Sequence, residues 1–163
     1  MTIQPDPATV QQMIDRMVIG EMQNRYMFAL DWHDPDMYVG LFTEDAILEW
    51  PEGRAQGREA IRAACIRIGK FFDNLAAAAA PRKPFQLRHF VTNQTFAVTG
   101  DTARAWAYWF DLNNDNLQRW PYLAAYGHYD DDLVRTADGW RFSHRRIFNE
   151  MTGETPPGNP VAG

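Results

Sequence analysis

Asp31 and His89 are the side chains of this sequence best suited to acid/base chemistry. Asp31 ends an apolar segment with helical spacing, and Asn24 and Met27 lie on the same stripe of that helix. A carboxylate on such a face is partly removed from water, which raises its pKa and makes it a better base. The spacing also fits a second interpretation, in which Asp31 is a solvated residue of the turn that follows the helix.

His89 opens an otherwise apolar strand-like run instead of standing in a loop. Histidine has the unperturbed side-chain pKa nearest to neutrality, so it is the usual proton shuttle. A carboxylate that orients one ring nitrogen would leave the other nitrogen as a directed base, and such a pair needs no metal ion. An imidazole that is simply hydrogen-bonded at the start of a strand fits the spacing equally well.

The turn after this run decides which residues share the face of His89. We favour the register in which Thr99-Gly100 forms a two-residue loop. That register places three aromatic residues beside His89: Trp106, Tyr108 and Phe110. A three-residue loop would place Trp109 and Asp111 there instead, and a β-bulge would also restore Asp111 to this face.

A guanidinium on the last strand is a candidate ligand for a substrate oxygen. Five residues share the apolar parity of this strand: Trp140, Phe142, His144, Arg146 and Phe148. Because the apolar parity is expected to face inward, Arg146 is predicted to point into the structure, where it would bind an oxyanion. The alternative is a buried ion pair with an acidic residue of the preceding strand, one of Asp130, Asp131 or Asp132.

The elements that must position these residues are three helices followed by a sheet. The helices are expected over residues 8–31, from the Asp34-Pro35 start signal onward, and from residue 57 to a point before Pro81. A brief strand-like run over 46–50 ends at Trp50. Four longer runs follow, over 85–98, 102–113, 122–135 and 140–148, and their turn residues predict two antiparallel hairpins.

This order predicts an α+β fold with three N-terminal helices packed on a curled antiparallel sheet. A helix and a curled sheet leave a gap between them, which is a natural ligand pocket. We expect one domain over residues 1–149 and an irregular tail over 150–163. Aromatic residues make up 13% of the chain and seven methionines join them, which fits either a well-filled core or an aromatic-lined cavity.

The composition argues against several classes of protein. The formal charge is -5 and no run of Lys or Arg could follow a phosphate backbone, so we expect no nucleic-acid partner. No apolar stretch of about 18 residues and no secretory signal are visible, which predicts a cytoplasmic protein without a membrane partner. A single cysteine, Cys65, and histidines at unmatched spacing predict no metal site. Nucleotide-binding, serine-hydrolase and zincin motifs do not occur in the sequence.

Four segments of the chain resemble the SnoaL-like branch of the NTF2-like superfamily. They read RYMFALDWHDPDMYVGLFTEDAILEW, GREAI, RHFVTNQTFAVTGDTARAWAYW and YGHYDDDLVRTADGWRFSHRRI. The resemblance extends over nearly all of the chain, from about residue 10 to residue 149. It implies a cone-shaped barrel, and it is only loosely specific for a reaction because the superfamily contains enzymes, subunits and binding modules.

The resemblance also assigns roles to individual positions. In the dehydratase-like members an Asp near the end of the first helix pairs with a His at the start of the long strand, and these positions hold Asp31 and His89. Tyr26 resembles the tyrosine with which several such enzymes bind or protonate a substrate oxygen, and Arg146 falls where some carry an arginine. These enzymes work without cofactors, so none is expected here. Such domains usually form homodimers or homotrimers through the outer face of the sheet.

Together these features predict a cofactor-independent lyase. His89, oriented by Asp31, would remove a proton while Tyr26 or Arg146 stabilises the departing or enolising oxygen. Elimination of water is the first expectation, and retro-aldol cleavage that releases a small aldehyde is a related one. Isomerisation or cyclisation would use the same residues.

The expected substrate is a hydrophobic aromatic or polycyclic small molecule. Trp50 and Phe148 are predicted to bind it together with the aromatic residues beside His89, and the sequence leaves open whether Asp111 or Tyr126 also line the site. Two alternatives come from other classes of protein. One is a non-catalytic small subunit of an aromatic-ring dioxygenase, and the other is a binding module that holds a ligand without converting it.

Overall fold

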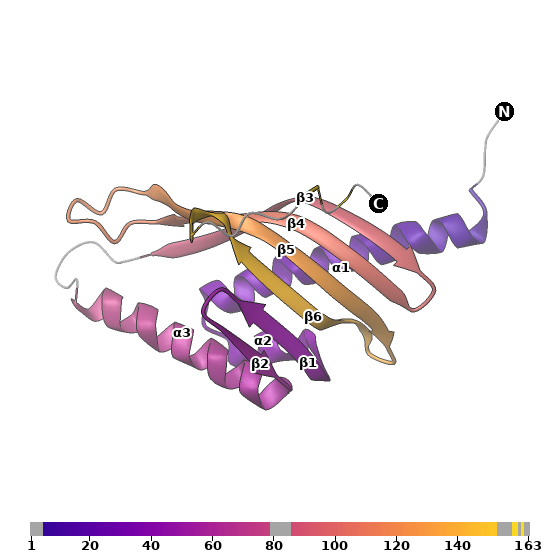
Figure 1. Ribbon diagram of the computed structural model, residues 1–163, viewed down its shortest axis with the longest axis horizontal. Coiled ribbons are helices and arrows are strands. Elements are labelled where there is room, and N and C mark those ends of the chain that lie inside the picture. The colour runs from indigo at the N-terminus through magenta and orange to yellow at the C-terminus, as the bar shows by residue number, and fades with distance from the viewer. Residues whose placement is uncertain (1–4, 79–85, 153–157, 160, 162–163) are drawn as a thin grey trace.

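The computed structural model describes residues 5–78, 86–152, 158–159 and 161 of the chain. Its elements are α1 (Pro7–Asp31), α2 (Pro35–Gly40), β1 (Phe42–Trp50), β2 (Gly53–Gln56), α3 (Arg58–Ala78), β3 (Leu87–Thr99), β4 (Thr102–Asn113), β5 (Tyr122–Thr136), β6 (Gly139–Asn149) and η1 (Glu150–Thr152). Figure 1 shows α1 crossing one side of the sheet, with α3 lying beyond β1 and β2. The α+β class is confirmed, and the four predicted long strands correspond to β3 to β6.

The helices begin where aspartate and proline mark their starts. At the start of α1, the Asp6 carboxylate accepts two backbone hydrogen bonds of 3.0 Å from the first turn, and Asp34 caps α2 in the same way. These aspartates satisfy N–H groups that have no partner within the helix. The predicted continuation of α3 toward Pro81 lies outside the described residues, as does most of the predicted tail. None of the described helices is both long enough and apolar enough to span a membrane.

The sheet is mixed, which corrects the antiparallel sheet expected from the sequence. Its strand order is β2-β1-β6-β5-β4-β3, and β1 runs parallel to β6 whereas the other pairs are antiparallel. The run predicted over 46–50 is only the end of β1, because the exposed polar residues Glu44 and Asp45 conceal the beginning of that strand. β2 then folds back on β1, so two strands stand between α2 and α3, and the three helices do not form one N-terminal block.

A β-bulge in β3 controls the direction in which His89 points. Between Thr92 and Thr95, two residues of β3 face a single residue of β4. The first of the two, Asn93, has a φ of 52°, in the left-handed region that asparagine tolerates better than most residues. Beyond the bulge the alternation of β3 is shifted by one residue. His89 therefore pairs with Asp111 and faces the interior with it.

The register expected for this hairpin is wrong. The strands are antiparallel as predicted, but the two-residue loop is Gly100-Asp101, and the bulge then exchanges the two faces of β3. Three aromatic residues predicted to lie beside His89 are instead on the outer face of β4: Trp106, Tyr108 and Phe110. The inner face of β4 carries alternating buried residues: Ala103, Ala105, Ala107, Trp109 and Asp111.

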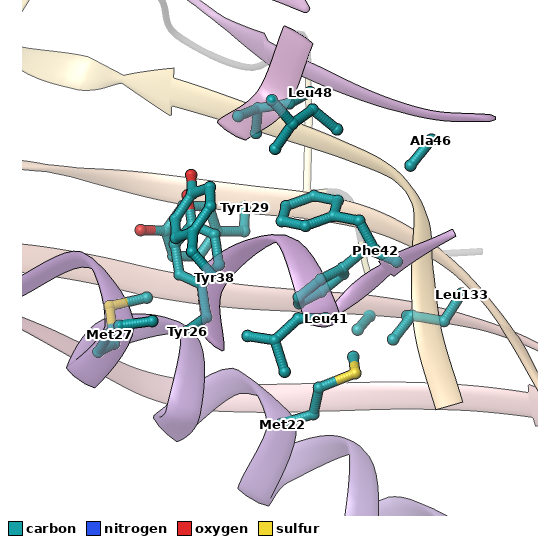
Figure 2. Close-up of a cluster of buried hydrophobic side chains, with 14 of the residues drawn as sticks. Met22, Tyr26, Met27, Tyr38, Leu41, Phe42, Ala46, Leu48, Tyr129 and Leu133 are labelled. Atoms are coloured by element: carbon teal, nitrogen blue, oxygen red, sulfur yellow. The ribbon is translucent and has the colours of Figure 1, made fainter. Parts of the chain in front are cut away.

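The core lies between α1 and the inner face of the sheet. Residues of α1 spaced three or four positions apart are buried, among them Ile19, Met22 and Tyr26. Figure 2 shows Met22 and Tyr26 on α1, packed in one cluster with Phe42 and Leu133 of the sheet. This packing fixes α1 across the sheet and so determines where the C-terminal end of α1 meets β3.

Candidate active site

A cavity of about 360 Å³ lies between the helices and the inner face of the sheet. Most of its lining is aliphatic or aromatic, including Leu30, Leu48, Trp50, Ile68, Phe71, Phe72, Trp109 and Ile147. Its polar groups include the imidazole of His89 and three tyrosines, Tyr26, Tyr38 and Tyr129. An apolar cavity with a few convergent polar groups is the usual form of a small-molecule site. Trp50 and Tyr26 thus lie in the wall of a cavity, as expected from the sequence.

Asp31 and His89 are in direct contact. Asp31 is the last residue of α1, and His89 is near the start of β3. Asp31 Oδ1 lies 2.6 Å from His89 Nδ1, and the backbone N–H of His89 donates to Oδ1 and Oδ2 at 3.2 and 3.0 Å. The side chains are only 6% and 13% exposed, so water competes little for these contacts. Because the carboxylate occupies Nδ1, Nε2 is the ring nitrogen left for a ligand in the cavity.

His89 also lines a second, more polar hollow of about 260 Å³. The two hollows share Leu30, Phe72 and His89, and Asp31 lines only the polar one. The imidazole therefore stands where the apolar cavity meets a more polar space, while its carboxylate partner stays on the polar side.

Asp111 is a second buried carboxyl group beside this pair. It lies opposite His89 in the sheet and accepts a hydrogen bond of 3.1 Å from the backbone N–H of Ala125. Burial raises the pKa of Asp111, while His89 and the backbone N–H groups of Ala124 and Ala125 act against this rise. Asp111 is not among the described residues that line the apolar cavity. Asp111 is therefore placed to act on His89 and not to contact a molecule in that cavity.

Three tyrosines form the second polar group of the cavity. The hydroxyl oxygens of Tyr26 and Tyr38 are 2.6 Å apart, and the ring of Tyr129 lies 6.1 Å from that of Tyr26. In Figure 2 the hydroxyl ends of these rings lie together at one side of the core cluster. Burial raises the pKa of all three phenols, so at neutral pH they are uncharged hydrogen-bond donors. Tyr38 and Tyr129 were not found by the sequence analysis.

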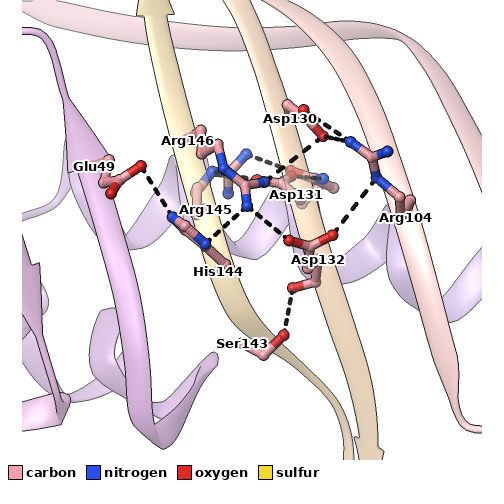
Figure 3. A network of polar contacts seen from close by, with 10 residues as sticks. Glu49, Arg104, Asp130, Asp131, Asp132, Ser143, His144, Arg145 and Arg146 are labelled. Carbon is pink, nitrogen blue, oxygen red and sulfur yellow. Dashed lines mark hydrogen bonds and ion pairs between the residues drawn. The ribbon is translucent and has the colours of Figure 1, made fainter. Parts of the chain in front are cut away.

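Arg146 does not reach the cavity, which corrects its predicted inward position. The pairing of β5 with β6 shifts at Ser143, so the inward parity passes from Phe142 to Arg145. Arg146 lies on the outer face, where it donates to Asp132 at 3.0 Å. Figure 3 shows this contact within a network of charged side chains on β4, β5 and β6. The ion-pair alternative therefore holds for Arg146, although the pair is half-buried and not in the core.

The remaining aromatic residues predicted for the site also lie on the outer face. Phe148 stacks on His128 with ring centroids 4.4 Å apart, and Phe110 stacks on Phe90 at 4.9 Å. Tyr126 pairs with Phe110 in the sheet and is exposed. Phe148 and Tyr126 are thus excluded from the cavity by the same alternation that excludes Phe110. Self-association through this outer face stays a prediction.

Arg145 takes the inward position that the sequence analysis gave to Arg146. Its side chain is fully buried, donates to Gln23 Oε1 at 2.7 Å and lies 3.4 Å from Asp131 Oδ1. The guanidinium carbon is 3.9 Å from the ring centroid of Tyr26 and 3.8 Å from that of Tyr129. The burial of Arg145 beneath the tyrosines was not predicted, because the alternation of the last strand, counted without the shift at Ser143, assigned Arg145 to the solvent side.

Asp131 leads to a prediction about the pH dependence of stability. Burial raises the pKa of Asp131 to about 6, against the opposing effects of Arg145 and Gln23. The folded protein holds this proton more tightly than the unfolded chain, whose aspartates titrate near pH 4. The free energy of unfolding should therefore fall as the pH rises from about 4 to about 6, on the order of 2 kcal/mol from this residue.

Urea denaturation across this pH range tests the prediction with Asp131→Asn. The variant should show a smaller fall in the free energy of unfolding between pH 4 and 6 than the wild type. Asp130→Asn, on the outer face of the same strand, is the matched control and should keep the wild-type slope. Parallel curves for Asp131→Asn and the wild type would contradict the assignment.

No three His, Cys, Asp or Glu side chains within the described ranges are placed to hold a metal ion. The absence of a metal and of a cofactor from the reaction stays a prediction.

Comparisons with known proteins identify relatives of this fold. A family model described as a SnoaL-like domain matches residues 11–146. Rv2910c, an uncharacterized protein of Mycobacterium tuberculosis, is 30% identical over 148 residues, which cover 88% of this chain and 92% of that protein. Among solved structures, an NTF2-like protein with a cystatin-like fold from Novosphingobium aromaticivorans has a TM-score of 0.71 and 25% identity, covering 86% of this chain and 84% of its own. A proposed scytalone dehydratase from the same organism has a TM-score of 0.72 and 22% identity, and the match covers 95% of this chain and 98% of that protein.

Proposed function

The chain belongs to the family of SnoaL-like domains, and from this premise we propose that it is a small-molecule-converting enzyme, a cofactor-independent acid/base lyase. The contact between Asp31 and His89 at the wall of an apolar cavity carries the proposal. A histidine held by a buried carboxylate at one nitrogen, with the other nitrogen open to a cavity, has the geometry of a general base. The tyrosine hydroxyls in the same wall supply hydrogen-bond donors for an oxygen that becomes negatively charged.

The proposed substrate is a hydrophobic aromatic or polycyclic molecule with a carbonyl group. The apolar side chains of the cavity, Trp50 and Trp109 among them, favour a flat molecule with few polar groups. The wall also contains Cys65 and Arg67, and the polar groups assigned to the reaction are the imidazole of His89 and the hydroxyls of Tyr26, Tyr38 and Tyr129. One carbonyl oxygen at the tyrosines and one acidic C–H bond at His89 would match them.

The first step of the proposed reaction is proton removal. His89 Nε2 takes the proton from the carbon next to the carbonyl, the electrons of the C–H bond form a carbon–carbon double bond, and the π electrons of the carbonyl move to its oxygen to give an enolate. Tyr26 and Tyr38 are hydrogen-bonded to each other, so one of the pair donates its O–H to that oxygen as its negative charge develops while the other donates to its partner. The negative carboxylate of Asp31 stabilises the imidazolium that forms at the same time.

The second step expels the leaving group. The enolate electrons re-form the carbonyl and make a carbon–carbon double bond, while the bond to a hydroxyl on the next carbon breaks. This hydroxide takes the proton from the imidazolium of His89 and leaves as water, so the enzyme returns to its initial state. In the retro-aldol variant, His89 deprotonates the hydroxyl group instead, and the adjacent carbon–carbon bond breaks to release an aldehyde and leave an enolate. The enolate carbon then takes the proton back from the imidazolium of His89, so the ketone and the base are both restored.

The proposal is tested with ketones fused to an aromatic ring. A ketone without a leaving group tests the first step, because the enzyme should exchange its α-protons for deuterium in D₂O, observed by NMR. The matching β-hydroxy ketone tests the complete reaction, and mass spectrometry should detect loss of water or of formaldehyde. Exchange and elimination at the rates found without protein would contradict the proposal.

Tyr26→Phe gives a second prediction for the same reaction. The substitution keeps the ring and removes one hydroxyl of the hydrogen-bonded pair that holds the enolate oxygen, so kcat should fall by about 10- to 100-fold. KM should change little, because the aromatic wall is preserved. Steady-state kinetics with the β-hydroxy ketone measure both constants. Tyr126→Phe, on the outer face, is the matched control and should have wild-type kinetics; an equal loss in both variants would remove Tyr26 from the mechanism.

A further inference from the structure

We infer that Arg145 is a positioning residue whose buried positive charge, behind the tyrosine rings, makes the cavity selective for an anionic oxygen of the phenolate or enolate type. The inference rests on the proposed function, since it takes the cavity as the ligand site and the tyrosine hydroxyls as the groups that contact the ligand oxygen. Arg145 itself is fully buried and is not among the described residues that line the cavity. It therefore acts through the tyrosines and does not touch the ligand.

The geometry places the charge against the ring faces. The guanidinium carbon of Arg145 lies 3.9 Å from the ring centroid of Tyr26, 3.8 Å from that of Tyr129 and 4.4 Å from that of Phe142. These are close distances for a cation–π contact, and the guanidinium is fully buried, so bulk solvent screens its charge little. A positive charge in this position attracts electron density that accumulates on the phenol oxygens or on an anion hydrogen-bonded to them.

The hydrogen bonds around Arg145 only partly satisfy its guanidinium. Nη2 donates to Gln23, but among the described residues Nε and Nη1 have no hydrogen-bond partner, and neither has Asp131 Oδ1. The carboxyl of Asp131 lies 3.4 Å away, and its remaining oxygen accepts from Gln23 at 2.8 Å. A buried pair with such imperfect geometry contributes little to stability, because desolvation offsets the attraction. The pair is therefore not explained by its contribution to the stability of the fold. We assign it the role of placing the positive charge of Arg145 behind the tyrosine rings.

The acidic groups near the tyrosines offset this charge only in part, because at both Tyr26 and Tyr129 the effect of Arg145 on the phenol exceeds the opposing effect of Asp131. The titratable groups that act on the tyrosines include Asp31 at the end of α1, Tyr38 on α2, Cys65 on α3 and Asp131 on β5. Arg67 on α3 and His89 on β3 line the same cavity, and both are unchanged in the variants compared below. Burial raises the pKa of Cys65 to about 11, so its thiol is neutral at pH 7. Against the larger effect of burial, Arg145 lowers the pKa of Tyr26 and Tyr129, which is the direction expected from a cation behind each ring.

Equilibrium binding of two probes to the full chain tests the inference. 4-Nitrophenol ionises near neutral pH and its phenolate form is visible by absorbance, whereas 4-nitroanisole has the same shape without an ionisable proton. The variants are Asp131→Asn, which keeps Arg145, and Asp131→Asn with Arg145→Met, which removes both charges at similar volume. Arg145→Lys retains the charge without the planar group.

The double variant should bind 4-nitrophenolate about tenfold more weakly than Asp131→Asn, the loss expected for a desolvated cation near an anion. Its affinity for 4-nitroanisole should be unchanged, which shows that the cavity is intact, and Arg145→Lys should keep most of the preference for the anion. If the double variant does not fold, Asp131→Asn with Arg145→Gln replaces it, because glutamine retains a partner for Gln23.

Equal affinity of the single and double variants for the phenolate would overturn the inference, and so would a wild-type protein that binds only the neutral phenol. Turnover is not part of this measurement. A wild-type protein with normal turnover but no preference for the phenolate would therefore remove only the role of Arg145. An anion preference without any turnover would remove only the proposed lyase reaction.

Discussion

Replacing His89 with alanine or glutamine is expected to lower kcat by about 10²- to 10⁴-fold, the range that a positioned acid/base group contributes. Neither side chain accepts a proton at neutral pH, so the first step loses its base. The fold should survive, because His89 is at the cavity wall and the backbone N–H that donates to Asp31 remains. Deuterium exchange into the ketone and elimination from the β-hydroxy ketone measure the loss, and circular dichroism verifies the fold.

Asp31→Asn should reduce kcat by at least about 10²-fold through a different effect. The amide group of asparagine can present its NH₂ to His89 Nδ1, which then acts as an acceptor and leaves the proton on Nε2. That tautomer cannot remove a proton from a ligand in the cavity. The backbone N–H of His89 can still donate to the asparagine oxygen, so the end of α1 should stay attached to β3.

The chain contains a matched control for the His89 substitutions. His128 Nδ1 lies 2.8 Å from Glu150 Oε1, so a second buried imidazole with a carboxylate partner exists outside the cavity. His128→Gln makes the same chemical change at that pair and should leave kcat near the wild-type value. The assignment of the base would be wrong if the His89 variants kept nearly full activity. It would also be wrong if His128→Gln lost as much activity as His89→Gln.

The contact between Asp31 and His89 was predicted from the resemblance to a family and not from residue spacing. Spacing alone allowed Asp31 to be solvated and His89 to be a simple strand residue. What the local pattern could supply was the helix that ends at Asp31 and the strand that begins near His89. The meeting of the two segments depends on how α1 packs across the sheet, a long-range property that short-range periodicity does not contain.

The sequence of β3 contains a signal that predicts the face on which His89 lies. Val91 packs against the core on one side of the bulge, and Phe96 and Val98 do so on the other side. These positions have opposite parity, and a change of apolar parity within one strand is the signature of a bulge. Asn93, the bulge residue with positive φ, lies between them.

The inner face of β4 was assigned wrongly because its largest side chains lie on the outer face. The large aromatic residues of this strand were expected to face inward, yet the inner face carries alanines such as Ala105 and Ala107 together with Trp109. Both faces of this sheet are rich in aromatic residues, so hydrophobicity alone does not distinguish the core side. In β6 the inner face was also assigned wrongly. The shift at Ser143 turns Arg145 inward and Arg146 outward, the reverse of what a regular alternation predicts.

Gly127→Ala is expected to lower the free energy of unfolding by about 3 kcal/mol or more, at the upper end of what overpacking a well-packed site costs. A Cβ atom at this position of β5 would lie 1.8 Å from the backbone oxygen of Phe148 and 3.1 Å from the indole of Trp109. The first of these contacts involves backbone, which cannot rotate away. The neighbouring strand β6 would have to move away from β5 near its C-terminal end.

The same substitution should also impair the cavity, because the close approach at Gly127 holds one of its walls. Trp109 of β4 pairs with Gly127 of β5, and its indole ring extends over this glycine toward β6. There the indole N–H donates to the backbone oxygen of Phe148 at 3.2 Å. If β6 moves, Trp109 loses this partner and the wall that it forms is no longer fixed. Weaker binding of 4-nitroanisole should therefore accompany the loss of stability.

Gly40→Ala is the control that separates crowding from the loss of a glycine as such. Gly40 ends α2, and a Cβ atom there would meet no other atom within 4 Å. Alanine also restricts the unfolded chain more than glycine does, so this variant should be as stable as the wild type or slightly more stable. Urea denaturation compares the two variants directly. Equal midpoints for Gly127→Ala and Gly40→Ala would show that β5 and β6 are not packed as closely as the structure has them, and that Trp109 is held in the cavity wall by something other than its contact with β6.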